Sequence, residues 1–415
     1  MLYCLQTWIR NNALYYLFQF LRYSSALTGL RFVAIAMVLL EHFAGFIGYP
    51  ISSGLFGVNL FFVLSGFLIT SILVSQQDLS PLKAYLNFLA RRGLRIFPIY
   101  YLTIVVLLII KAPFILQRWP YLVTYTYNYQ LAYLNFPSEP YRPMWSLCVE
   151  EQFYLFFPII AIALRKRWWS LLTVCSLLIS IGILQLFFAV LTPAGYNYVS
   201  LITNMIPLAL GAVGAMISNK NFFVKWLFNN YLIEVFALVL IAVSMYFFNY
   251  PFQMIIFSGL NLYLVIKAYH FRFSIGWINS FMTKKIVVLL GQISYGIYLY
   301  HNLVQFYFTK YIFGPIWNKI TFENFEVFSF IEFHSWVVKL PLYSFITFIL
   351  AYYSYKIIEQ PILKLKDCYF KSTTTWKIYS RRSSWQSVGY SEKKIIFRIS
   401  MKRGRSSTCF RRGIN

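Results

Sequence analysis

Charged residues are scarce in this 415-residue chain, and acidic residues are the scarcest of them. Asp, Glu, Lys and Arg make up 12% of the sequence, while hydrophobic residues make up 59%. A soluble globular chain is about 45–50% apolar and about 25% charged. A fold of this length cannot hide so much apolar surface from water. The composition therefore excludes a soluble globular protein and predicts that the excess apolar surface faces lipid.

Cysteine motifs and a cleavable leader are also missing. The five cysteines form neither a CxxC pair nor a dense framework, which argues against a disulfide scaffold and a zinc site, and we expect no metal. Arg10 and Arg22 interrupt residues 1–26, and no small-residue cleavage site follows a compact apolar core there. We expect these residues to be a cytoplasmic leader, either irregular or lying on the membrane surface as an interfacial helix.

Long apolar runs, in contrast, recur along almost the whole chain. A hydrocarbon core about 30 Å thick needs roughly 20 apolar residues per helix, and open sheets cannot exist in lipid. We therefore predict an all-α fold, a polytopic membrane bundle of about ten transmembrane helices. The predicted spans are residues 27–46, 55–75, 94–112, 149–164, 168–190, 199–217, 230–248, 251–269, 286–308 and 336–358.

The net charge of +25 follows the predicted topology rather than a nucleic-acid site. Lys and Arg fall in alternate loops, and the loops near 46–54, 190–198 and 249–251 have none. Cytoplasmic loops collect these residues, so we predict a multi-pass protein of the cell inner or plasma membrane with both termini cytoplasmic. Residues 27–365 would form the membrane domain. The basic segment 366–415 is predicted to be a disordered cytoplasmic tail that adheres to anionic lipid.

The first predicted helix carries Arg31 and His42, and ionisable residues inside a span are candidates for function. Eleven residues of helix separate two side chains by about 16 Å and return them to within about 20° of the same face. An imidazole with an unperturbed pKa of about 6.5 suits proton abstraction from a hydroxyl. The alternative is a core histidine bonded to a neighbouring helix.

Three further clusters are candidate sites. Arg92 and Arg95 are neighbours on one helical face and bind phosphate oxygens or simply anchor the third span at its inner boundary. Ser146 and Glu150 fit a helix cap and a first-turn acid, although adjacent Glu150 and Glu151 also suit orienting His42. A stripe in the ninth span either bonds between helices or forms an acceptor site: Ser294, Tyr298 and His301. Asn59, Ser65 and Gly66 in the second span favour close helix packing.

Six segments taken together resemble a known family. In order they are LTGLRFVAIAMVLLEHF, GVNLFFVLSGFLI, RRGLRIFPIY, PMWSLCVEEQFYLFFP, GQISYGIYLYH and YKIIEQPIL. Over about residues 26–365 the chain is similar to acyltransferase family 3 of membrane proteins, to which bacterial O-antigen and exopolysaccharide O-acetyltransferases belong. Thr28 stands where many members have Asp, and we expect no hydrolase-like domain after the last predicted span, although some members carry one.

The resemblance implies roles for individual residues. His42 matches the family's essential histidine, and Arg31, Arg92 and Arg95 match arginines of the first and third helices, the latter two associated with acyl-CoA. Trp145, Ser146 and Glu150 match a tryptophan-serine-glutamate segment, and Glu359 and Pro361 match a closing Glu-x-Pro. We expect transfer of an acetyl group from cytoplasmic acetyl-CoA to a hydroxyl of a cell-surface glycan or similar acceptor.

The expected mechanism has His42 as general base and Glu150 as its partner. The acceptor would lie near Trp145, Ser146, Glu151, Ser294 and His301. Direct transfer and transfer through an acylated His42 fit the sequence equally. The alternative function is a secondary transporter or lipid-linked glycan flippase, against which stand the thin acidic relay and the lack of a visible inverted repeat.

Overall fold

The computed structural model describes residues 25–44, 52–218, 231–270, 273–317 and 335–369, and within these ranges it contains helices and loops but no strand. The predicted all-α fold is confirmed. The predicted leader lies almost entirely outside the described residues, as does most of the predicted tail. The last helix, α18 (Gln360–Tyr369), runs past the predicted end of the membrane domain at residue 365.

Among the described residues, seven helical stretches are long and apolar enough to cross a membrane. They are the first helix (Ser25–Ala44), α2 (Ser53–Ser75), α3 (Pro81–Ile109), α6 (Met144–Leu164), α7 (Trp168–Phe188), α11 (Tyr250–His270) and Trp336–Lys364, which joins α17 (Trp336–Ser354), η3 (Tyr355–Glu359) and the start of α18. Shorter apolar helices are α8 (Leu201–Ile217) and α10 (Tyr231–Phe247). The chain is a multi-pass membrane protein, and a helix overlaps every predicted span.

Two predicted spans differ in detail. The ninth is two helices, α13 (Lys285–Gln292) and α14 (Ser294–Phe308), with Ile293 between them. The third begins at Pro81 instead of residue 94, because proline suits the first helical turn and the polar segment after it continues the helix. Segments too short to predict are α4 (Ile115–Val123), α5 (Tyr127–Tyr133), η1 (Ala194–Tyr196), α12 (Gly276–Met282), η2 (Thr309–Phe313) and α15 (Gly314–Trp317).

Helix α2 lies at the centre of the bundle and packs closely on α8. A Cβ atom at Gly66 would overlap the Leu208 carbonyl of α8, and one at Gly211 would overlap the Val63 carbonyl of α2. Asn59 on the same helix donates to Ser258 Oγ of α11 at 2.9 Å. Small and polar residues replace the hydrophobic effect as the means of joining helices in lipid. The packing predicted for this span is confirmed at Gly66.

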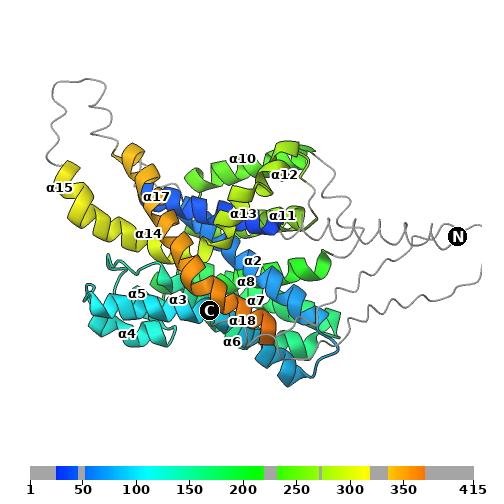
Figure 1. Cartoon of the computed structure of the whole chain (residues 1–415). Coiled ribbons are helices and arrows are strands. Elements are labelled where there is room, and N and C mark those ends of the chain that lie inside the picture. The colour runs from blue at the N-terminus through cyan, green and yellow to red at the C-terminus, as the bar shows by residue number, and fades with distance from the viewer. Residues whose placement is uncertain (1–24, 45–51, 219–230, 271–272, 318–334, 370–415) are drawn as a thin grey trace, which may run out of the picture.

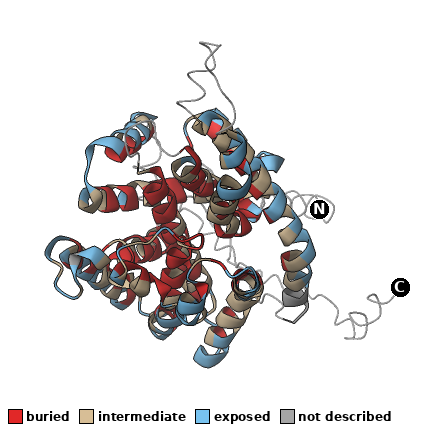
Figure 2. Ribbon diagram, turned by 90° about the vertical axis from the view of Figure 1, so that its left-hand side faces the viewer, coloured by how far each residue is buried: buried red, intermediate tan, exposed pale blue. Residues whose placement is uncertain are grey.

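The outside of the bundle carries large exposed side chains, whereas buried residues gather along its middle (Figure 2). Helix α7 presents Trp169, Leu184 and Phe188 outward, at 52–73% exposure. Lipid tails cover such a surface at no cost. Figure 1 shows α4 and α5 beside α3, away from the group formed by α10, α11 and α12.

A contact between two loops joins the end of α2 to the end of α6. Arg165, after α6, donates to the carbonyls of Gln76 at 2.7 Å and Leu79 at 2.5 Å, after α2. At the other ends of these helices, the Ser52 N–H donates to the Met245 carbonyl at 3.3 Å. The basic loop after α6 and the loop after α2 therefore share one end of these two helices, and the start of α2, which Glu41 binds beside His42, lies at the other end of α2.

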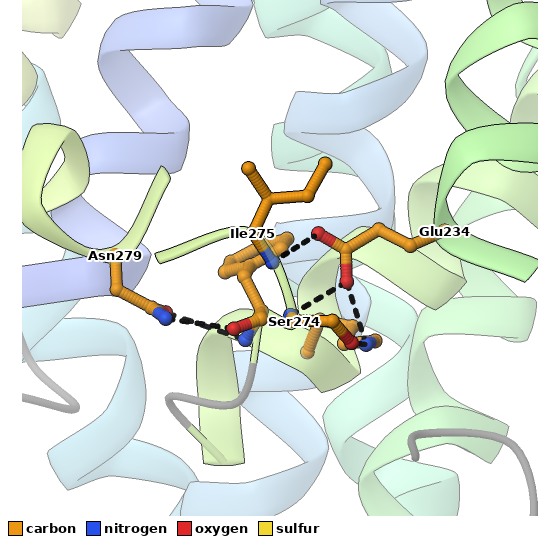
Figure 3. Close-up of polar contacts among 6 residues, drawn as sticks. Glu234, Ser274, Ile275 and Asn279 are labelled. Atoms are coloured by element: carbon orange, nitrogen blue, oxygen red, sulfur yellow. Dashed lines mark hydrogen bonds and ion pairs between the residues drawn. The ribbon is translucent and has the colours of Figure 1, made fainter. Parts of the chain in front are cut away.

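A buried ion pair joins α10 to α11, and its carboxylate also binds the segment after α11 (Figure 3). Lys267 donates to Glu234 Oε2 at 2.8 Å, and the N–H groups of Ser274 and Ile275 donate to the same carboxylate at 2.8 and 3.4 Å. Neither side chain of the pair is more than 1% exposed. Asn279 closes the turn by donating to the Phe273 carbonyl at 2.8 Å. These charges satisfy one another and hold the helices together.

Candidate active site

Three neighbouring cavities line up inside the bundle, and the predicted residues of the first helix open onto them. The arginine cavity is lined by Arg31, Arg92, Arg95 and Glu150 among others. The histidine cavity is lined by Glu41, His42, Arg142 and Trp145. The vestibule is lined by His42, Arg142, Asn302, Gln305 and Lys310. Arg31 and His42 do project from one side of the first helix, at different depths.

The three arginines of the arginine cavity come from two helices. Arg31 belongs to the first helix, while Arg92 and Arg95 lie within α3. The third helix therefore does not begin at these arginines, because α3 starts at Pro81, and both side chains line a cavity inside the bundle. Arg92 stacks over the Tyr154 ring, with its guanidinium carbon 4.8 Å from the ring centroid. Cation–π contact holds a guanidinium without neutralising it.

Glu150 is the one carboxylate that lines the arginine cavity, and hydroxyls hold it. Ser65 Oγ donates to Oε1 at 2.8 Å, and the Tyr154 hydroxyl donates to Oε2 at 3.0 Å. The described residues contain no ion pair within 4.0 Å that involves these arginines or Glu150. Glu151 and Glu359 act on Arg92 and Arg95 electrostatically but do not line the cavity. Because three guanidinium groups and only one carboxylate line the cavity, it favours the binding of an anionic ligand.

Glu150 and His42 were expected to be partners, but they line no common cavity. Glu150 shares its cavity with the arginines, while His42 lines the two cavities on the other side of Tyr298. The expected helix cap is also wrong, because α6 begins at Met144 after Pro143, so that Ser146 makes no cap bond and Glu150 falls beyond the first turn. Because α6 starts at Met144, Glu150 lies in its second turn and lines the arginine cavity.

Tyr298 separates the arginine cavity from the histidine cavity. It lines both, as does Val58. Its hydroxyl lies 2.6 Å from Ser146 Oγ and donates to the Pro143 carbonyl at 3.0 Å, which joins α14 to α6. Ser294 also lines the arginine cavity. The predicted polar stripe on α14 therefore faces inward. Hydrogen bonding between helices was one of its two predicted roles, and Tyr298 makes such a bond.

The vestibule surrounds His42 with polar groups from α14 and the loop before α6. Gln305 Nε2 donates to the His42 carbonyl at 2.6 Å, and Asn302 Nδ2 donates to the Glu139 carbonyl at 3.1 Å. Arg118 and Tyr127 bind the Glu139 carboxylate at 2.9 and 2.6 Å. Burial and this carboxylate raise the pKa of Tyr127 far above its ordinary value, so its hydroxyl remains a donor. The charge of Glu139 is balanced by Arg118, and its second oxygen accepts the hydrogen bond from Tyr127.

The other predicted residues divide between the cavities and their surroundings. Trp145 lines the histidine cavity, with its ring 5.0 Å from that of Tyr198. Glu151 and His301 line none of the three cavities. His301 instead lies fully buried against His42, with 4.8 Å between the ring centroids. Glu151 and His301 were expected to contact the acceptor, but neither side chain lines a cavity that an acceptor could enter.

Several residues of the site had not been singled out from the sequence. Glu41 accepts a hydrogen bond from the Gly54 N–H at 2.6 Å, which ties the start of α2 to the first helix beside His42. Arg142 lines both cavities that contain His42. An aromatic neighbour such as Tyr154 carries no signal in so aromatic a chain. Glu41, the acidic residue directly before His42, was the one sequence signal that could have identified these residues.

Comparison with known proteins agrees with the six segments. The family model for an acyltransferase domain matches residues 24–356. The chain belongs to acyltransferase family 3. The match includes the first helix, α3, α6 and α14, so the whole set of cavities lies within the family domain. It makes the chain a membrane protein of an acyltransferase family.

Relatives in this family occur in Staphylococcus aureus. The O-acetyltransferases OatA of strains NCTC 8325 and COL are each 28% identical to this chain over 379 residues, which covers 83% of this chain and 58% of the relative. A protein of strain MSSA476 is 26% identical over 395 residues. The chain thus spans less than two thirds of the length of these relatives. No solved structure matches it.

Proposed function

We propose that this chain transfers an acetyl group from acetyl-CoA to a hydroxyl group of a cell-surface glycan. The observation that carries the proposal is the position of His42, which lines both the histidine cavity and the vestibule. The histidine cavity meets the arginine cavity at Val58 and Tyr298. One imidazole is thus within reach of two routes, as a transfer between substrates that arrive from opposite sides requires.

The arginine cavity is the proposed site of the donor's phosphate groups. Guanidinium groups bind phosphate oxygens through planar, paired hydrogen bonds, and Arg31, Arg92 and Arg95 have no carboxylate within ion-pair distance among the described residues. The cavity volume of about 80 Å³ suits one small group and not a whole coenzyme. The thioester would pass Tyr298 toward His42, and the adenosine of the donor would remain outside the cavity.

His42 is the proposed general base. Its ring nitrogen takes the proton of the acceptor hydroxyl while that oxygen attacks the thioester carbonyl carbon. The C–S bond then breaks, and the proton passes from His42 to the departing sulfur. Such a base contributes about 10²–10⁴ in rate, and holding both substrates at one ring adds the gain of proximity. A two-step route through acetyl-His42 requires the same residues.

The vestibule is the proposed acceptor site. Its polar lining of two amides, two hydroxyls, two cations and one carboxylate suits a polyol: Asn302, Gln305, Ser138, Thr309, Arg142, Lys310 and Glu139. OatA is named an O-acetyltransferase, which supports a hydroxyl as the acceptor group. Lipid surrounds the bundle, and nucleic acid has no part in the proposal.

Incubation of membranes with radiolabelled acetyl-CoA tests the function. We expect label in the glycan fraction, and we expect His42→Gln to lower the rate about 10²–10⁴-fold while the melting temperature is retained. His270→Gln is the matched control, because His270 lies at the far end of α11 with its Nε2 3.0 Å from the Ser218 carbonyl. Full activity of His42→Gln would exclude His42 as the base. Transport of glycan without label would favour a flippase.

Cysteine labelling from outside intact cells tests the proposed orientation. Gly195 and Lys166 flank α7 at its two ends, and both are exposed. If the basic loops are cytoplasmic, a membrane-impermeant thiol reagent should label Gly195→Cys and spare Lys166→Cys. The parent chain controls for the native cysteines. The reverse pattern would place the arginine cavity outside, away from cytoplasmic acetyl-CoA.

A further inference from the structure

His301 is the closest aromatic neighbour of His42 among the ring contacts of the described residues, and its hydrogen bonding fixes its tautomer. Its Nδ1 lies 2.6 Å from the Tyr298 carbonyl oxygen. A carbonyl oxygen can only accept, so Nδ1 must carry the proton. In a neutral imidazole the other nitrogen is then an acceptor. His301 Nε2 therefore presents a lone pair.

That lone pair is buried without a partner. His301 is 0% exposed, and no donor among the described residues lies within hydrogen-bond distance of Nε2. A buried acceptor left unsatisfied destabilises the folded protein, so its persistence calls for an explanation. The residue lines none of the three cavities, so a substrate does not reach it directly. His42, whose ring meets that of His301, does line the vestibule.

We infer that His301 is a positioning residue for His42, accepting a hydrogen bond from the His42 ring N–H when both substrates are bound. The inference rests on the proposed function. The two rings meet edge to face, with centroids 4.8 Å apart and planes at 64°, and hydrogen bonds of catalytic groups often tighten only in the loaded complex. One nitrogen of His42 is thereby held toward His301, and the other faces the acceptor.

The arrangement gives the proton transfer a complete path. When the free nitrogen of His42 takes the hydroxyl proton, the ring becomes positive, and its second N–H donates to His301 Nε2. When the C–S bond breaks, His42 returns the first proton to sulfur, and His301 is unchanged. A neutral acceptor suits this depth, because an unpaired carboxylate there would be costly to bury. Glu150, expected in this role, lies in the arginine cavity instead.

Three variants test the inference in the radiolabel assay. His301→Phe retains a ring without nitrogen, and we expect the maximal rate to fall about 100-fold, the cost of a misplaced catalytic group, while KM for acetyl-CoA is unchanged. His301→Gln offers an amide oxygen near the Nε2 position and should recover most of the rate. His270→Phe, the matched loss of a histidine bonded to a carbonyl, should match the parent chain.

Each outcome separates this inference from the proposed function. If the parent chain transfers acetyl and His301→Phe is equally fast, or if His301→Gln is as slow as His301→Phe, the positioning role fails and the function stands. If the parent chain transfers none, the function fails. ¹⁵N-histidine NMR of the purified full chain then still tests the geometry: an unprotonated Nε2 in His301 is expected, and a protonated Nε2 overturns the inference.

Discussion

The bundle buries charge in two ways. At the junction of α10 and α11, Lys267 and two backbone N–H groups satisfy the Glu234 carboxylate, and neither residue of the pair lines any of the three cavities. In the arginine cavity, three guanidinium groups face one carboxylate, and that carboxylate binds hydroxyls instead of arginine. The first arrangement is closed, and the second has capacity for a ligand.

The difference teaches how to interpret ionisable residues inside a membrane. Their cost makes each a candidate for function, yet a closed pair meets that cost by itself and then serves to hold helices together. An open cluster of one sign keeps unfavourable repulsion that only a bound anion relieves. Function is therefore indicated by charges that line a cavity and lack partners, and less by burial as such.

The largest effect is expected from opening the closed pair. Glu234→Leu leaves Lys267 buried without its carboxylate, and removing one partner of a buried pair costs about 3–5 kcal/mol. The melting temperature in detergent should fall sharply. The double variant Glu234→Leu with Lys267→Met should recover part of the loss, since no charge remains, although Ser274 and Ile275 still lose their acceptor. A double variant no better than the single one would contradict the pairing.

A smaller effect of another kind is expected in the open cluster. Arg95→Gln should raise KM for acetyl-CoA about 10-fold to 100-fold, because a hydrogen bond to a charged group contributes about 1.5–3 kcal/mol. Its melting temperature should equal or exceed that of the parent chain, since one of three like charges is removed. An unchanged KM would contradict the phosphate site. A fall in melting temperature as large as that of Glu234→Leu would show that Arg95 stabilises the fold as the Glu234–Lys267 pair does, and would contradict the difference between the two regions.

The smallest effect compares two glycines and tests the packing that supports both regions. A Cβ at Gly66 meets the backbone of α8, so Gly66→Ala should destabilise the bundle by about 1–3 kcal/mol. Gly259 of α11 has no atom within 4 Å of the same position. Gly259→Ala should therefore be neutral or stabilising by about 1 kcal/mol. Equal melting temperatures for the two variants would contradict the close approach of α2 and α8.

Local patterns predicted those parts of the site that lie on single helices. Arg31 and His42 share a face because eleven residues make about three turns, and Arg92 and Arg95 are neighbours for the same reason. The Gly66 packing followed from residue size. Contacts between distant residues were not predictable: Lys267 is 33 positions from Glu234, and neither stood out in the sequence, because pairing depends on how α10 returns beside α11.

The sequence by itself determined that this chain is an all-helical multi-pass membrane protein of acyltransferase family 3, because apolar excess and ordered motifs are properties of the chain read in one dimension. Only the tertiary structure decided that His42 lines two cavities, that Glu150 shares a cavity with three arginines, and that the ring of His301 contacts the ring of His42. The reason is physical. A helix fixes which residues share a face, but the start of each helix and its packing partners fix the depth at which that face meets another.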